Sequence, residues 1–118
     1  MRDNRKKMIN QINVEELAVI LAEENNERQL IDVRETSEAE IAFLPPFKLL
    51  PLSQYDQWKD QITSILNPTL ETIVLCHHGI RSANMCQWLL SQGFTNVKNV
   101  LGGIDAYSVY VDRTIPRY

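Results

Sequence analysis

Residues 72–82 read Thr72-Ile73-Val74-Leu75-Cys76-His77-His78-Gly79-Ile80-Arg81-Ser82. The apolar run that ends at Leu75 predicts a buried strand, and residues 81–92 predict a helix, so a tight loop containing Gly79 joins the two. In such a loop several backbone N–H groups converge on one point beside the positive end of the helix dipole. A thiol held there at Cys76 should ionise more readily than a free cysteine. The stretch therefore predicts an α/β structure with a nucleophilic cysteine at the end of a strand.

Strand and helix patterns alternate on both sides of this stretch. They predict a helix that is capped by Asn13, begins at Val14 and ends around Asn25-Asn26, a strand over 29–34, a helix over 37–43, a strand over 48–52 and a helix over 53–66. A strand over 97–101 and a helix over 104–111 follow. Gly93 suits the left-handed turn after the helix over 81–92. Neighbouring parallel strands need crossover connections, so this alternation predicts an α/β layer structure with a mainly parallel sheet.

Length and composition limit the classes of protein that this chain can be. With 118 residues, of which 44% are hydrophobic, we expect one domain, preceded by a short basic extension over residues 1–12. The formal net charge of −3 leaves no broad basic face for nucleic acid. No apolar stretch approaches the roughly 20 residues of a membrane span, and no apolar core of a secretory signal is present at the start. Charge and hydropathy thus predict neither nucleic-acid nor membrane partners. The presence of only two cysteines fits free thiols in a reducing compartment, so we expect a cytoplasmic protein.

Three stretches together resemble single-domain rhodaneses. They are Leu30-Ile31-Asp32-Val33-Arg34-Glu35, the loop from Cys76 to Ser82, and Val100-Leu101-Gly102-Gly103-Ile104-Asp105-Ala106. Their order and spacing make a stronger signal than any of them alone. The resemblance implies a rhodanese domain over residues 13–118, with a three-layer fold in which helices cover both faces of a mainly parallel sheet of about five strands. Residues 112–118 are also similar to the end of rhodanese modules attached to ubiquitin-like activating enzymes, which suggests a sulfur relay.

The resemblance also implies an activity. Similar proteins take a sulfane sulfur from thiosulfate or a persulfide and pass it to a thiophilic acceptor. We therefore expect a sulfurtransferase in which Cys76 is the nucleophile and carries the persulfide. The expected partners are a small anionic sulfur donor such as thiosulfate and, as acceptor, a thiol or a sulfur-carrier protein. No cofactor is expected.

The loop residues after the cysteine are expected to line the site and bind substrate: His77, His78, Gly79, Ile80, Arg81 and Ser82. Adjacent residues of a curled loop point apart, which favours an entrance-lining role for the two histidines over proton transfer. Gly79 should allow a backbone conformation that a side chain would oppose. Ser82 is expected to cap the following helix.

Arg81 has two possible roles. Its guanidinium either faces the bound sulfur anion or holds the loop through a carboxylate such as Asp32, and the sequence favours neither. Asp32 and Arg34 are expected to support the loop as a structural ion pair. A metal site is not expected, because the spacing of Cys76 and Cys86 matches no Cys-x-x-Cys pattern and the histidines are adjacent. Cys86 falls on an apolar helix face and is predicted to be a buried, inert thiol.

Two other functions are possible for such a loop. Cysteine phosphatases and arsenate reductases of related fold place five residues between cysteine and arginine, whereas here only the four residues 77–80 intervene. The shorter loop makes a smaller cradle, which suits a sulfur atom better than a tetrahedral oxyanion. The third possibility is a non-catalytic rhodanese-like sulfur-carrier or interaction module. It is disfavoured because Cys76 lies in an intact loop.

Overall fold

A computed structural model describes residues 9–24 and 27–118, and these residues form a five-stranded, fully parallel sheet. The strands lie in the order β1-β5-β4-β2-β3. Their bounds are Asn10–Ile12 for β1, Arg28–Asp32 for β2, Lys48–Leu49 for β3, Glu71–Leu75 for β4 and Val97–Val100 for β5. Because the strands are parallel, β4 ends at the same edge of the sheet as its neighbours β2 and β5. The predicted α/β architecture with a mainly parallel sheet is confirmed.

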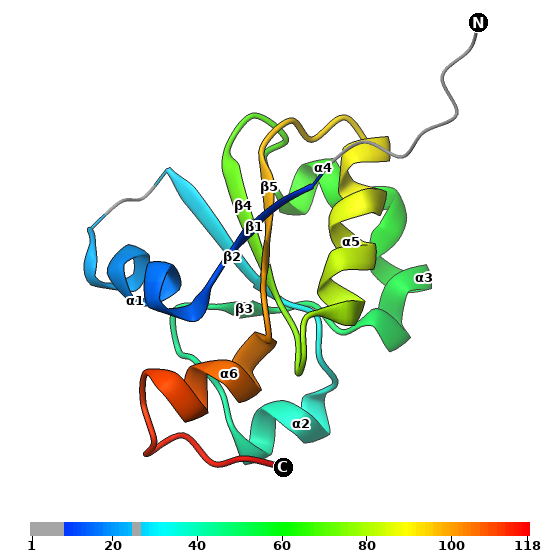
Figure 1. The fold of residues 1–118 in the computed structure, drawn as a ribbon. Coiled ribbons are helices and arrows are strands. Elements are labelled where there is room, and N and C mark those ends of the chain that lie inside the picture. Colours follow the sequence, from blue (N-terminus) through cyan, green and yellow to red (C-terminus); the bar gives the residue numbers. More distant parts are fainter. Residues whose placement is uncertain (1–8, 25–26) are drawn as a thin grey trace, which may run out of the picture.

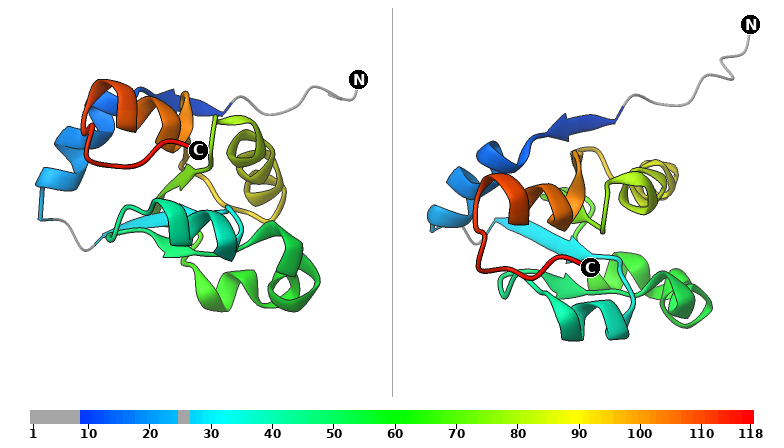
Figure 2. Two further views of the ribbon diagram at one scale, coloured as in Figure 1. Left: turned by 90° about the horizontal axis from the view of Figure 1, so that it is seen from below. Right: turned by 60° about the horizontal axis from the view of Figure 1, so that its bottom comes forward.

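Helices cover both faces of the sheet (Figure 1, Figure 2). On one face lie α1, Val14–Ala22, and α6, Gly103–Tyr110; on the other lie α3, Tyr55–Trp58, α4, Ile62–Ile65, and α5, Ile80–Ser91. The helix α2, Thr36–Ile41, lies near the C-terminal segment. Each face has its own apolar core, centred on Ile73 and Leu75 for one and on Val74 for the other. This confirms the expected three layers. None of the described helices is long and apolar enough to cross a membrane.

The first helix begins where the sequence predicts. The Asn13 side chain accepts from the backbone N–H of Glu16 at 2.7 Å, and the Glu16 carboxylate accepts from the backbone N–H of Asn13 at 3.0 Å. This reciprocal pair satisfies two of the N–H groups that a helix start leaves free. The predicted cap and the predicted start of this helix are confirmed, whereas its end at Ala22 comes earlier than the sequence predicts.

The predicted single helix over 53–66 is wrong, because short 3₁₀ turns alternate with short α-helices there. A 3₁₀ turn, η1 over Leu52–Gln54, precedes the short α3, and a second one, η2 over Lys59–Gln61, separates α3 from α4. Trp58 is buried at the end of α3, and its indole N–H donates to the carbonyl oxygen of Pro51 at 2.9 Å. The Trp58 ring also packs edge-on against Tyr55 and Trp88. Packing of this indole outweighs the regular helical period.

Three strands end earlier than predicted, among them β5, which ends at Val100, and one strand was not predicted. The strand expected over 29–34 ends at Asp32, and the strand expected over 48–52 comprises only Lys48–Leu49. The additional strand β1 lies within the segment expected to be an extension before the domain. It pairs with β5, and its Ile12 is buried. Three residues are too few to show a strand period in the sequence. Residues 1–8 of that expected extension lie outside the described residues.

Candidate active site

Cys76 is the first residue after β4 and lies at the carboxyl edge of the sheet. Only 1% of its surface is exposed. Its Sγ accepts a hydrogen bond from the backbone N–H of Gly79 at 3.0 Å and lies 3.2 Å from the hydroxyl oxygen of Ser82. Both groups place positive partial charge against the sulfur, so the pair favours an anion at Sγ. We call these three residues the Cys76 cradle.

Gly79 begins α5 as its N-cap residue, and its φ of +98° is a backbone conformation that side chains oppose. A Cβ at this position would also lie 3.1 Å from the carbonyl oxygen of Val100. The predicted conformational role of this glycine is confirmed. The expectation that Ser82 caps the helix is wrong, because Ser82 lies inside α5 and its hydroxyl points to the sulfur instead.

The start of α6 holds the loop from the other side. The N–H of Ile104 donates to the carbonyl oxygen of Cys76 at 2.9 Å, and the N–H of Asp105 donates to that of His77 at 3.1 Å. The loop carbonyls therefore satisfy N–H groups that the first turn of α6 leaves free. Gly103 makes this approach possible because it carries no Cβ. The Gly-Gly pair of the sequence thus positions the loop that carries the cysteine.

Arg81 holds the loop through a carboxylate, and the carboxylate is Glu38. Its two terminal nitrogens donate to the two Glu38 oxygens at 2.7 and 2.9 Å, in a bidentate pair that joins α5 to α2. The expectation that Asp32 could be the partner is wrong, since Asp32 is occupied by Arg34. The sequence did not single out Glu38, and its spacing of 43 residues from Arg81 offers no local signal.

Asp32 and Arg34 form the predicted structural ion pair, at 2.7 Å, with neither side chain exposed to solvent. The Arg34 guanidinium also donates to the carbonyl oxygen of Ala42 at 2.7 Å and to the Tyr118 hydroxyl at 2.8 Å. This buried charge pair is therefore hydrogen-bonded on several sides, as burial of charge requires. Its link to the loop that carries Cys76 is indirect. The Tyr118 hydroxyl, which accepts from Arg34, in turn donates to Glu38 at 2.9 Å, and Glu38 holds Arg81.

The two histidines differ in their surroundings. The His77 ring stacks on the Tyr118 ring with centroids 3.9 Å apart, and the His78 ring packs at a tilt on the His77 ring with centroids 3.8 Å apart. The expectation that the two adjacent histidines point apart is therefore wrong. Burial lowers the pKa of His77, so its ring is neutral at pH 7. His78 is exposed, and its Nδ1 lies 3.9 Å from Asp105. Among the described residues the hydrogen bonds to Sγ come from Gly79 and Ser82, which agrees with a lining role for both histidines.

Cys86 lies inside α5 and is fully buried. Burial raises the pKa of its thiol to about 12, so it stays protonated at neutral pH. The prediction of a buried packing thiol is confirmed.

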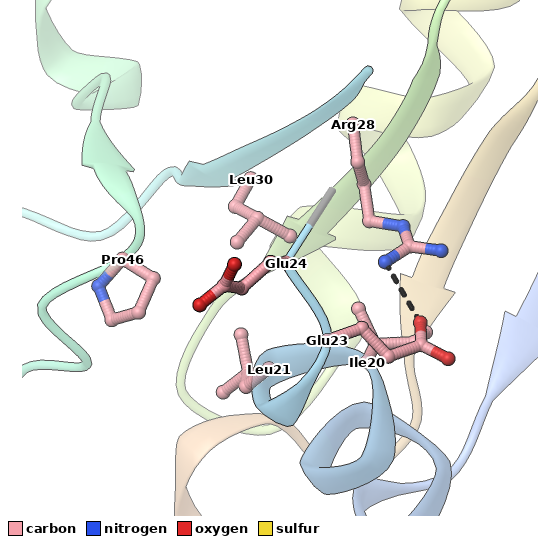
Figure 3. A pocket seen from close by; sticks show the side chains of 7 residues that line it. All are labelled: Ile20, Leu21, Glu23, Glu24, Arg28, Leu30 and Pro46. Atoms are coloured by element: carbon pink, nitrogen blue, oxygen red, sulfur yellow. Dashed lines mark hydrogen bonds and ion pairs between the residues drawn. The ribbon is translucent and has the colours of Figure 1, made fainter. Parts of the chain in front are cut away.

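Figure 3 shows the side chains that line a cavity of about 580 Å³, none of which belongs to the Cys76 cradle. Arg28, at the amino end of β2, lines the cavity together with Glu23, Leu21 and Pro46. The guanidinium of Arg28 is already engaged by Glu23 at 3.2 Å and by Glu71 at 2.5 Å. The cavity is at the edge of the sheet opposite Cys76, and it contributes no group to the cradle.

The domain profile that matches this chain is that of the rhodanese-like domain, over residues 13–109. The chain belongs to the rhodanese-like family. The expected family, and with it the expected fold, is confirmed. A crystal structure of a rhodanese-like domain protein from Staphylococcus aureus superposes with a TM-score of 0.74 and 25% identity, over 93% of this chain and 99% of that one.

Relatives of this rhodanese-like chain include proteins named sulfurtransferases. "Rhodanese-like/PpiC domain-containing protein 12, chloroplastic" of Arabidopsis thaliana is 56% identical over 93 residues, which are 79% of this chain and 31% of that protein. "Sulfurtransferase" of Allochromatium vinosum is 29% identical over 106 residues, 86% of this chain and 90% of that protein. "Adenylyltransferase and sulfurtransferase MOCS3-2" of Zea mays is 32% identical over 83% of this chain and 21% of that protein. The chain thus spans about a third of the Arabidopsis protein and a fifth of the maize protein. Cytoplasmic location stays a prediction.

The Glu38–Arg81 pair leads to a prediction about acid stability. Hydrogen bonds from Arg81 lower the pKa of Glu38 to about 2 from an ordinary 4.5. A carboxyl whose pKa is lower in the folded state stabilises the fold above pH 4.5, and this contribution is lost as the pH falls from 4.5 to 2. Glu38→Gln should therefore lower the free energy of unfolding by about 2 kcal/mol at pH 7, after allowance for the partial exposure of Arg81. The deficit should shrink towards zero near pH 2.

Urea unfolding at pH 7, 4.5 and 3 measures this deficit. Glu40→Gln is the matched control, because Glu40 lies on the same helix with an exposed side chain. A Glu38→Gln deficit that stays constant across these pH values would show that the ion pair does not lower the Glu38 pKa.

Proposed function

We propose that this rhodanese-like chain is a sulfurtransferase that moves a sulfane sulfur from thiosulfate or a persulfide to a thiol acceptor through a persulfide on Cys76. The observation that carries the proposal is the Cys76 cradle, in which a backbone N–H and a hydroxyl group meet a buried sulfur at 3.0 and 3.2 Å. The names of the Allochromatium and maize relatives support the same class of reaction.

The reaction consists of two displacements at sulfur. The Cys76 thiolate attacks the outer sulfur of thiosulfate, the new Sγ–S bond forms, and the S–S bond to the sulfonate sulfur breaks. Sulfite leaves with the electron pair of that bond. The acceptor thiolate then attacks the outer sulfur of the Cys76 persulfide, takes it as its own persulfide, and releases the Cys76 thiolate. Neither step needs an external oxidant or reductant.

Electrostatics are the main contribution of the protein to this cycle. The thiolate, the transition state of its attack on the donor and the persulfide are all negatively charged. In a buried site each of them needs hydrogen-bond donors in place of water. Gly79 and Ser82 supply such donors from fixed positions, since one is set by a left-handed backbone and the other by α5. Arg81 contributes the loop geometry, because its guanidinium is bound to Glu38.

Sulfur loading and phosphate-ester hydrolysis distinguish this proposal from the two alternatives. We expect the intact mass to increase by one sulfur atom after incubation with thiosulfate, and we expect cyanide to remove that sulfur and form thiocyanate. Under the same conditions p-nitrophenyl phosphate should not be hydrolysed. Hydrolysis without sulfur loading would favour a phosphatase. A chain that gains sulfur and cannot pass it to cyanide or a thiol would favour a carrier module.

A further inference from the structure

Asn99 is a buried residue of β5 that the chemistry above does not use. Only 2% of its surface is exposed. Its Nδ2 donates to the carbonyl oxygen of Gly79 at 3.1 Å, and its Oδ1 is hydrogen-bonded to the hydroxyl of Ser82. Gly79 and Ser82 are the two residues whose groups contact Sγ of Cys76. One amide therefore contacts both residues that donate to the sulfur, Gly79 through its carbonyl oxygen and Ser82 through its hydroxyl.

The partners of Asn99 determine which way its amide faces. The carbonyl oxygen of Gly79 can only accept, so Nδ2 must face it. The second Nδ2 hydrogen bond goes to Oε1 of Gln11 at 3.1 Å. An amide turned by half a rotation would place Oδ1 against the Gly79 oxygen, with two acceptors in contact. Oδ1 therefore faces the Ser82 hydroxyl.

Ser82 carries one hydroxyl proton and faces two acceptors, Oδ1 of Asn99 and Sγ of Cys76. When the sulfur is a thiolate, the proton points to Sγ, because hydrogen bonds to charged acceptors are the stronger ones. When the sulfur is a neutral thiol, the proton turns to Oδ1 of Asn99. The hydroxyl thus keeps a partner in both states, and its oxygen stays beside the sulfur.

We propose that Asn99 is the positioning residue of the Cys76 cradle. Its nitrogen holds the Gly79 carbonyl, so that the Gly79 N–H stays aimed at the sulfur, and its oxygen holds the Ser82 hydroxyl within reach. Asn99 itself touches neither the sulfur nor the substrate. The proposal builds on the proposed sulfur transfer, because it concerns the same thiolate.

Asn99→Ala should slow two reactions of Cys76 by about tenfold each, the value expected for loss of aim of one hydrogen bond to a charged group. The reactions are alkylation by iodoacetamide at pH 7 and persulfide formation from thiosulfate. Alkylation does not require sulfur transfer, so slower alkylation without persulfide in any variant would refute the proposed function and leave the role of Asn99 intact. An unchanged alkylation rate would overturn the role of Asn99.

Gln11→Ala is the matched control. It removes the third hydrogen-bond partner of the Asn99 amide, and this partner, Gln11, has no hydrogen bond to Sγ of Cys76. Both rates should therefore stay within about twofold of wild type. In a Ser82→Ala background, Asn99→Ala should cost only about threefold, because one of its two connections to the sulfur is already absent. A full tenfold loss in that background would show that Asn99 acts through general stability and not through the cradle.

Asn99→Asp gives a pH readout that a merely structural role would not produce. The protonated carboxyl can donate to the Gly79 carbonyl and accept from Ser82, as the amide does, whereas the ionised carboxyl cannot donate. Alkylation of this variant should match wild type at low pH and fall behind it by tenfold or more as the introduced carboxyl ionises. A variant-to-wild-type rate ratio that is constant with pH would contradict the proposal.

Discussion

Replacing Cys76 by serine should abolish sulfur loading and should lower the rate of thiosulfate-dependent thiocyanate formation by at least about a thousandfold. A serine hydroxyl is a far weaker nucleophile at neutral pH and cannot carry a persulfide, and no residual pathway through the cradle replaces it. The measurements are the intact mass after incubation with thiosulfate and the steady-state rate with cyanide. The fold should be retained, because serine is slightly smaller than cysteine and has donors around it at Gly79 and Ser82.

Cys86→Ser is the matched control for this experiment. Cys86 is the other cysteine of the chain, lies on α5 with no exposed surface, and has a thiol whose pKa burial raises to about 12. This variant should load sulfur at the wild-type rate if it folds. If sulfur loading persisted in Cys76→Ser and disappeared in Cys86→Ser, Cys86 would be the residue that carries the sulfur. That result would refute the assignment of Cys76.

Gly103→Ala should disrupt the catalytic loop and lower the free energy of unfolding by about 3 kcal/mol or more. A Cβ at Gly103 would lie 2.3 Å from the carbonyl oxygen of His77 and 2.4 Å from that of Cys76. These backbone oxygens accept from Asp105 and Ile104, so the loop cannot move away without breaking those hydrogen bonds. Urea unfolding measures the stability, and sulfur loading measures the loop. We expect both to be impaired.

Gly93→Ala separates the clash from backbone strain. Gly93 has a φ of +97° after α5, and a Cβ there would meet nothing within 4 Å. This variant should lose only the roughly 1–2 kcal/mol that a left-handed alanine costs, with normal sulfur loading. Equal losses of stability in the two variants would mean that the close approach of α6 to the loop contributes nothing beyond the strain of a positive φ.

The local features of the loop that carries Cys76 could be predicted from the sequence. An apolar run followed by Cys76 and a glycine-containing loop places a thiol at a strand end, and the structure has it there. The conformation of Gly79, the burial of Cys86 and the cap at Asn13 also follow from nearby residues. All of these depend on contacts within a few positions of the chain, which the printed order of residues specifies directly.

The partners of the loop side chains could not be predicted. Glu38 binds Arg81 from 43 positions away, and Tyr118 contacts Arg34 across 84 positions. Several carboxylates and hydroxyls of the chain could serve as such partners, and nothing in their spacing ranks them. Ser82 shows the same limit, because a serine near a helix start predicts a cap, whereas here its hydroxyl faces Cys76 and Asn99.

The sequence by itself determined the layered α/β architecture, the position of Cys76 at the end of β4 and the need for a glycine at position 79, since these rest on periodicity and on backbone conformations of single residues. Only the tertiary structure decided that Arg81 is held by Glu38 and that Asn99 lies behind Gly79 and Ser82. The physical reason is that parallel strands bring the ends of β2, β4 and β5 to one edge of the sheet. Side chains distant in the chain become neighbours there, and hydrogen-bond geometry then selects among them.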